Sequence, residues 1–160
     1  MSVKFSDSVK YIGVDDTTID LFESQYVVPK GVSYNSYVIL DDKVALMDTV
    51  DKRGMEQWEK NLTAALDGRA VDYLIIQHLE PDHAGSVERL LDYSPQMKVI
   101  ATGCALGFLK EIVNRDFVGI PARDKEKMTI GNKTLEFLFV PNLHWPDTMY
   151  TFIEEEQILV

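Results

Sequence analysis

The sequence is poor in cysteine, which limits both its compartment and its means of stabilisation. Cys104 is the only cysteine among 160 residues, so an internal disulfide framework is excluded. Chains without disulfides are typical of a reducing compartment, and we expect a cytoplasmic protein. We expect Cys104 itself to be a small buried residue between a strand and a helix, although a thiol leaves a redox role open.

Long hydrophobic runs are also missing. No apolar run approaches the length needed to cross a bilayer, and the segment Met1–Lys10 has no continuous apolar stretch. The sequence therefore predicts a soluble protein with no membrane partner. Its hydrophobic content of 46% is nevertheless sufficient for a packed core, and we expect residues 1–160 to form one domain.

Basic residues are outnumbered by acidic ones. Sixteen lysines and arginines stand against 26 aspartates and glutamates, which gives a formal net charge of -10. Such a surface repels nucleic acid and anionic lipid, because both are bound mainly through positive side chains. We expect no nucleic-acid partner.

The first fifty residues predict short antiparallel strands. Strands over residues 10–14 and 18–22 flank Asp15–Asp16, and strands over 34–40 and 44–49 flank Asp41–Lys43, which are typical turn residues. The rest of the chain alternates, with helices predicted over 52–66, 86–93 and 105–114 and strands over 71–76, 98–101, 134–140 and 149–153. This order predicts an α/β or α+β fold in which helices pack outside a mixed sheet.

All three histidines lie in two short segments. His78 and His83 belong to the run 77–83, which also contains Glu80 and Asp82, and His144 lies in the segment 142–147. Imidazole is the commonest protein metal ligand, and carboxylates are the usual partners of iron, manganese or magnesium. The pattern predicts a metal site.

The local backbone predicts how these side chains divide. Pro81 disfavours a helical Glu80, so residues 78–81 should be extended, and alternate side chains such as His78 and Glu80 then converge on one ion. After a bend at Gly85 toward a helix near Ser86, Asp82 and His83 can face a second ion. A sheet that places strand 71–76 near strand 134–140 would bring His144 toward His78 and His83.

Structural interpretations stay open for the individual residues. A histidine at a strand end is often only hydrogen-bonded, Asp82 can cap the following helix, and Pro146–Asp147 can be an ordinary turn. Trp145 and Tyr150 fit a pocket wall or simple aromatic packing, and Glu154–Glu156 fits a solvated turn. The metal interpretation is favoured because four ligand-type residues lie within six positions.

The segments 78–86 and 143–149 closely resemble the motifs of flavodiiron proteins, also called A-type flavoproteins, which belong to the metallo-β-lactamase superfamily. Zinc hydrolases of that superfamily carry a histidine where this chain has Glu80, and a carboxylate there suits iron better than zinc. The resemblance implies a four-layer αββα sandwich with a diiron site. It assigns His78, Glu80 and His144 to one iron, and Asp82 and His83 to the other.

The resemblance also implies an activity and partners. Family members reduce oxygen to water, nitric oxide to nitrous oxide, or both, with FMN and a flavoprotein or rubredoxin-like electron donor, and they tend to be head-to-tail homodimers. In the family, a bridging aspartate, a final histidine and a flavodoxin-like FMN domain follow the position of Val160. We therefore expect the N-terminal portion of the sandwich, one retained metal ion, and a complementing C-terminal chain.

Three alternatives remain at this stage. The chain fits a diiron oxygen-binding sensor module, a zinc-dependent hydrolase that activates water, or an inactive fragment. Nothing in the sequence distinguishes oxygen from nitric oxide as the substrate.

Overall fold

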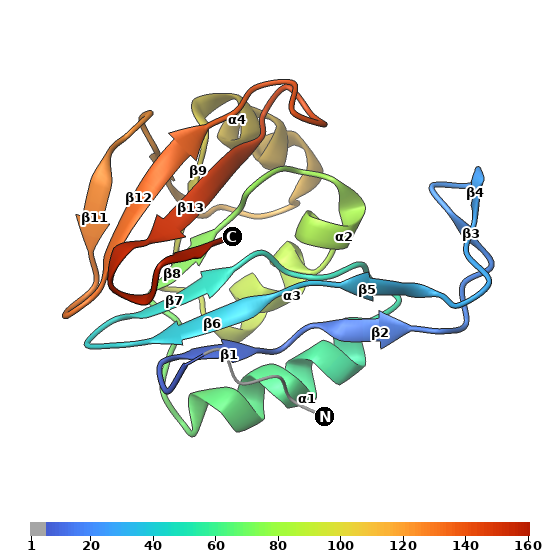
Figure 1. Cartoon of the computed structure of the whole chain (residues 1–160), viewed down its shortest axis with the longest axis horizontal. Coiled ribbons are helices and arrows are strands. Elements are labelled where there is room, and N and C mark those ends of the chain that lie inside the picture. The colour runs from blue at the N-terminus through green and yellow to red at the C-terminus, as the bar shows by residue number, and fades with distance from the viewer. Residues whose placement is uncertain (1–5) are drawn as a thin grey trace.

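A six-stranded sheet forms the middle layer of the molecule (Figure 1). The computed structural model describes residues 6–160, so half of the segment Met1–Lys10 lies outside the described residues. The strand order is β1 (Val9–Tyr11), β6 (Tyr37–Leu40), β7 (Val44–Met47), β8 (Tyr73–Ile75), β9 (Lys98–Ala101) and β10 (Val118–Pro121). The predicted antiparallel opening is confirmed for β1, β6 and β7, whereas β7 to β10 are parallel.

Helices cover one face of this sheet. They are α1 (Met55–Leu66), α3 (Val87–Tyr93) and α4 (Gly103–Ile112), with the short α2 (Pro81–Ala84) between β8 and α3. Each main helix presents an apolar stripe to the sheet, and Trp58 of α1 is completely buried in the resulting core. The helices and strands predicted after residue 50 lie close to their observed ranges, whereas α2 and β10 were not predicted.

A second, antiparallel sheet covers the other face. Its strands are β11 (Lys127–Thr129), β12 (Thr134–Phe139), β13 (Met149–Ile153) and β14 (Ile158–Leu159). All four residues of β7 are buried, because Val44 and Leu46 face the helices while Ala45 and Met47 face the second sheet. Residues 6–160 thus form three of the four layers of the expected sandwich: one layer of helices and two sheets.

A narrow arm projects from one end of the large sheet (Figure 1). Its base is the pair β2 (Val14–Asp16) and β5 (Val32–Tyr34), and its tip is the hairpin β3 (Leu21–Phe22) and β4 (Tyr26–Val27). The predicted turn at Asp15–Asp16 is wrong, because both residues lie in β2. Asp16 is buried there and accepts hydrogen bonds from Tyr34 and Arg53.

Two other expectations are wrong in detail. The strands near residues 71–76 and 134–140 lie in different sheets and do not share one. Cys104 is exposed and not buried, because it lies in the first turn of α4 on the face opposite Ala105 and Leu106.

The segment Glu154–Glu156 connects β13 to β14 as a 3-10 helix (η1). Its acidic side chains pair with Lys127 and Lys133, as a solvated turn allows. Within residues 6–160, none of the helices is both long and apolar enough to span a membrane.

Candidate metal centre

The loop after β8 supplies the first part of the candidate site. Glu80 is extended, with ψ 146°, as the following proline predicts. Helix α2 begins at Pro81 itself, so the chain turns helical earlier than the position near Ser86 that the sequence suggested. This early turn brings the ring centroid of His83 to 4.0 Å from that of His78.

The loop between β12 and β13 supplies His144. Its backbone has φ 89°, a positive value that residues other than glycine rarely adopt. The Asp147 carboxylate accepts a hydrogen bond from the Leu79 amide at 2.9 Å, and the Met149 amide donates to the Gln77 carbonyl at 2.9 Å. Asp147 is therefore a buried link between the two loops and more than an ordinary turn residue.

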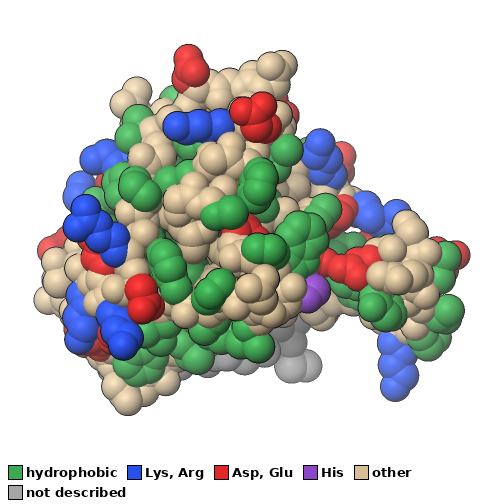
Figure 2. Space-filling view, turned by 90° about the horizontal axis from the view of Figure 1, so that it is seen from above, with side chains coloured by type: hydrophobic (Ala, Val, Ile, Leu, Met, Phe, Trp, Pro, Cys, Tyr) green, Lys and Arg blue, Asp and Glu red, His purple; other side chains and the backbone are tan. Residues whose placement is uncertain are grey.

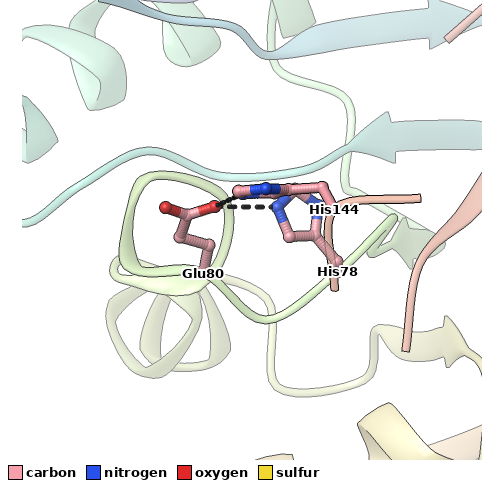
Figure 3. A group of neighbouring side chains, drawn as sticks. All are labelled: His78, Glu80 and His144. Atoms are coloured by element: carbon pink, nitrogen blue, oxygen red, sulfur yellow. Dashed lines mark hydrogen bonds and ion pairs between the residues drawn. The ribbon is translucent and has the colours of Figure 1, made fainter. Parts of the chain in front are cut away.

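His78, Glu80 and His144 converge at this junction (Figure 3). Oε2 of Glu80 lies 3.1 Å from Nε2 of His78 and 2.6 Å from Nε2 of His144. One potential ligand atom from each residue lies within 4.8 Å of the others. His78 and Glu80 are buried, whereas His144 is exposed at the rim.

The chemistry of this set fits a cation. Among residues 6–160, Oε1 of Glu80 and Oδ1 of Asp82 are buried without a hydrogen-bond partner. Burial raises the pKa of Glu80, but hydrogen bonds from Glu23, His144 and His78 outweigh it and hold the pKa at about 2. An ionised carboxylate with a free buried oxygen beside two imidazoles can hold ferrous iron or zinc.

Asp82 and His83 lie beside this set but outside its three-atom cluster. Nε2 of His83 is 3.6 Å from Oδ2 of Asp82, and the His83 ring centroid is 4.0 Å from that of His78. Burial raises the pKa of Asp82. Asp82 lies in the first turn of α2, which Glu80 precedes, so it is not the residue that caps this helix. Together, Asp82 and His83 can hold a second ion next to the first.

Asp48, which follows β7, also belongs to the site, although no sequence motif pointed to it. This buried residue has φ 54°, and its two carboxylate oxygens accept hydrogen bonds from the Gln77 amide at 2.8 Å and from His83 Nδ1 at 2.7 Å. Burial lowers the pKa of His83, but the charge of Asp48 outweighs it and raises the pKa to about 9. An acidic residue directly after an apolar strand was the available signal.

A cavity of about 350 Å³ adjoins the candidate ligands. His78, His83, His144 and Tyr150 are among the residues that line it, which favours the pocket wall over simple aromatic packing for Tyr150. The ring of Trp145 lies 6.3 Å from the rings of both His78 and His144. A small diatomic molecule has ample room in this cavity.

Comparison with known proteins gives consistent matches. The family described as "ODP family beta lactamase" matches residues 32–160. The flavo-diiron protein FprA2 of Clostridium acetobutylicum is 37% identical over 98% of this chain, and a nitric oxide reductase of Moorella thermoacetica is 33% identical over 99% of it. The chain spans 40% of the length of each of these two relatives.

Solved structures match the fold over nearly the whole chain. The rubredoxin oxygen:oxidoreductase of Desulfovibrio gigas has a TM-score of 0.92 at 28% identity, and the match covers 99% of this chain and 40% of that protein's chain. The flavodiiron protein of Giardia intestinalis has a TM-score of 0.90 at 30% identity, and the match covers 99% of this chain and 39% of that protein's chain. These matches confirm the predicted sandwich fold.

Proposed function

The chain belongs to the ODP family of β-lactamase-like domains, and on this premise we propose that it forms the metal-binding part of a flavodiiron oxidoreductase. The predicted resemblance to flavodiiron proteins is itself confirmed by the relatives. The proposed reaction is the reduction of oxygen to water, of nitric oxide to nitrous oxide, or both. Each substrate is named for one relative, so the chain's own preference stays open.

One observation carries this proposal. Glu80 shares a single carboxylate oxygen with two imidazoles, and one of these, His144, lies 64 residues away in the chain. A carboxylate between two histidines is a harder ligand set than the nitrogen-rich sites typical of zinc hydrolases. It therefore favours iron over zinc. The geometry therefore supports a redox function better than metal-assisted hydrolysis.

The residues of the chain have distinct parts in this proposal. His78, Glu80 and His144 would hold one iron, and Asp82 and His83 a second. Iron bound in this way would supply the electrons that reduce a diatomic substrate. Asp48 accepts the Nδ1 proton of His83, which leaves the Nε2 lone pair directed away from Asp48 and free to act as a ligand.

The shape of the site assists the same chemistry. Asp147 fixes the backbone between His78 and Glu80, so the two side chains keep their mutual orientation. The cavity beside them admits small molecules and is partly walled by Leu143 and Tyr150. These apolar surfaces limit the access of bulk water to a bound substrate.

We further propose that electrons arrive from FMN and from a flavoprotein or rubredoxin-like donor. Additional metal ligands would then come from sequence beyond these 160 residues, either in a longer protein or in a complementing chain. A homodimer would place the flavin of one copy near the metal centre of the other. Family membership and the similarity to a rubredoxin oxygen:oxidoreductase support these partners.

The test begins with metal-free protein loaded anaerobically with ferrous iron. Reduced FMN is then supplied as the electron source, and the consumption of oxygen or nitric oxide is measured by electrode and nitrous oxide by gas chromatography. We expect consumption above that of metal-free protein and of a His144→Ala variant. Equal rates in all three samples, or hydrolysis of a β-lactam or thioester by the zinc-loaded protein alone, would contradict the proposal.

A further inference from the structure

A polar pair lies in the mainly apolar layer between the two sheets. Ile75 of β8 faces the second sheet, and Gln77 lies two positions later, so its side chain points to the same side. In β13, Thr151 lies between Met149 and Ile153, which both belong to the core between the sheets. Gln77 is 4% exposed and Thr151 is fully buried. The pair therefore joins the sheets inside the molecule.

Two hydrogen bonds connect the members of this pair. Nε2 of Gln77 donates to Oγ1 of Thr151 at 3.0 Å, and the same hydroxyl donates to Oε1 of Gln77 at 3.3 Å. The backbone amide and carbonyl of Thr151 bond to Val160, each at 2.9 Å. Thr151 thus contacts its own sheet through its backbone and the first sheet through its hydroxyl.

The backbone of Gln77 extends the same link. Its amide donates to Oδ1 of Asp48 at 2.8 Å, and its carbonyl accepts from the Met149 amide at 2.9 Å. The next residue in the chain is the candidate ligand His78, and Gln77 also lines the cavity beside the candidate ligands. Gln77 therefore joins the ends of β7 and β8 to the strand that follows the loop of His144.

Little of the candidate metal centre is exposed, so buried contacts determine how its ligands are placed. In Figure 2, a small histidine surface is visible between hydrophobic and acidic side chains, whereas His78 and Glu80 are buried. A slip of one residue along a strand would move the loop of His144 by about 3.3 Å. Metal–ligand distances tolerate only about 0.2 Å. Apolar packing is not directional, so it cannot prevent such a slip as hydrogen bonds can.

The stability of the core does not itself require a polar pair at this place. Replacing both partners of a buried hydrogen bond with apolar groups of the same shape is nearly neutral. Ile75 and Ile153 show that apolar side chains pack well at the flanking positions of both strands. A fully paired polar contact instead rigidifies a core in one arrangement. The pair therefore has a role in geometry rather than in stability alone.

We propose that Gln77 and Thr151 are positioning residues of the metal centre, because they hold its two ligand-bearing loops in register. Gln77 fixes the chain directly before His78. Thr151 fixes the strand that follows His144. This inference rests on the proposed metal site and deepens it, and neither side chain acts as a ligand.

The experiment compares two substitutions that remove different atoms of Thr151. Thr151→Val removes the hydroxyl and keeps the shape, whereas Thr151→Ser keeps the hydroxyl and removes the methyl group. The full chain is titrated with Co²⁺, whose visible absorption reports both affinity and coordination. We expect Thr151→Val to weaken Co²⁺ binding about tenfold and to change the absorption band, and Thr151→Ser to bind as the wild type does. Thr129→Val, at an exposed threonine of the same sheet, is the control and should match the wild type.

A double variant separates positioning from stability. Gln77→Leu combined with Thr151→Val removes both polar partners, so its midpoint of urea unfolding should lie close to that of the wild type. Its Co²⁺ affinity should nevertheless stay about tenfold weaker, with the changed absorption band. Wild-type Co²⁺ binding in a stable double variant would show that the pair only fills the core, and would overturn the inference.

The other outcomes separate this inference from the function on which it builds. Wild-type affinity and spectrum in Thr151→Val would overturn the positioning role and leave the three-residue metal site intact. An equal loss in Thr151→Ser would assign the effect to the packing of the methyl group and would also overturn it. If the wild type binds no Co²⁺, the metal site is contradicted, and this inference with it. Circular dichroism of each variant verifies that it is folded.

Discussion

Oδ2 of Asp48 lies 2.7 Å from Nδ1 of His83, and this contact joins the end of β7 to helix α2. The hydrogen bond determines the orientation of the imidazole and which nitrogen stays free. In the metal-free protein it also stabilises the protonated ring, so the pKa of His83 rises to about 9. Asp48 is thus a positioning residue that acts through His83.

Replacing Asp48 with asparagine should lower the pKa of His83. The amide carries no charge, so the pKa should fall from about 9 toward the ordinary value of 6.5. NMR titration of the imidazole resonances in metal-free protein measures this change. Asp67→Asn is the matched control, because Asp67 is also a left-handed aspartate, with φ 48°, but is exposed. An unchanged His83 pKa in Asp48→Asn would contradict the assignment.

The same contact should make the stability of the metal-free protein depend on pH. Because the folded-state pKa of His83 is above its unfolded value, its stabilisation is complete below about pH 6.5 and is lost as the pH rises through about 9. Urea unfolding should therefore show a free energy of unfolding that declines over this window in the wild type. The decline should be smaller in Asp48→Asn, and parallel curves would argue against this contribution.

Removal of His144 should abolish tight metal binding. His144 contributes one of the three converging ligand atoms, so His144→Ala should weaken Co²⁺ or Zn²⁺ binding about 100-fold or more, beyond the effect of typical outer-shell changes. Isothermal titration calorimetry measures the affinity. Leu143→Ala, the exposed neighbour in the same loop, should bind as the wild type does. Similar losses in both variants would point to a loop rearrangement.

Ser36 should stabilise the fold through hydrogen bonds that link the core to the candidate site. Its buried hydroxyl accepts a hydrogen bond from Trp58 Nε1 at 3.1 Å and donates to the Asp48 carbonyl at 2.9 Å. Ser36→Ala leaves both partners unpaired, and we expect the free energy of unfolding to fall by about 2–3 kcal/mol. Denaturant unfolding measures it, and Ser33→Ala, which removes an exposed hydroxyl, should change it by less than about 0.5 kcal/mol.

Asp16 should stabilise the fold only above acidic pH. Burial raises the pKa of Asp16, but the hydrogen bonds from Thr18, Arg53 and Tyr34 outweigh it and hold the pKa well below its ordinary value. Asp16→Asn should therefore lower the free energy of unfolding by about 1.5–3 kcal/mol at pH 7. The difference from the wild type should shrink as the pH falls below about 3.8.

The neighbouring residue supplies the control for this measurement. Asp15 is exposed and its carboxylate accepts a hydrogen bond from the exposed Ser33 hydroxyl, so Asp15→Asn should have little effect at any pH. An equal loss of stability in both variants, or a difference that persists unchanged at low pH, would contradict the account of Asp16.

Local patterns determined much of the fold. Helix α1 and the strands β8, β9 and β13 lie near their predicted positions because their apolar residues repeat with the period of each structure. Pro81 restricts Glu80 through a steric effect of adjacent residues, so its extended backbone was also predictable. The turn at Asp15–Asp16 was not, because hydrogen bonds from Tyr34 and Arg53 hold the buried Asp16 in a strand despite its turn propensity.

The sequence by itself thus determined the type of each candidate ligand and the local backbone around His78 and Glu80. Only the tertiary structure decided that His144 meets Glu80 from the second sheet and that Asp48 orients His83. The physical reason is that local structure depends on neighbours in the chain. The contact of His144 with Glu80 depends on how the two sheets pack face to face, and that of Asp48 with His83 depends on the pairing of β7 with β8. Both contacts join residues that are far apart in the chain.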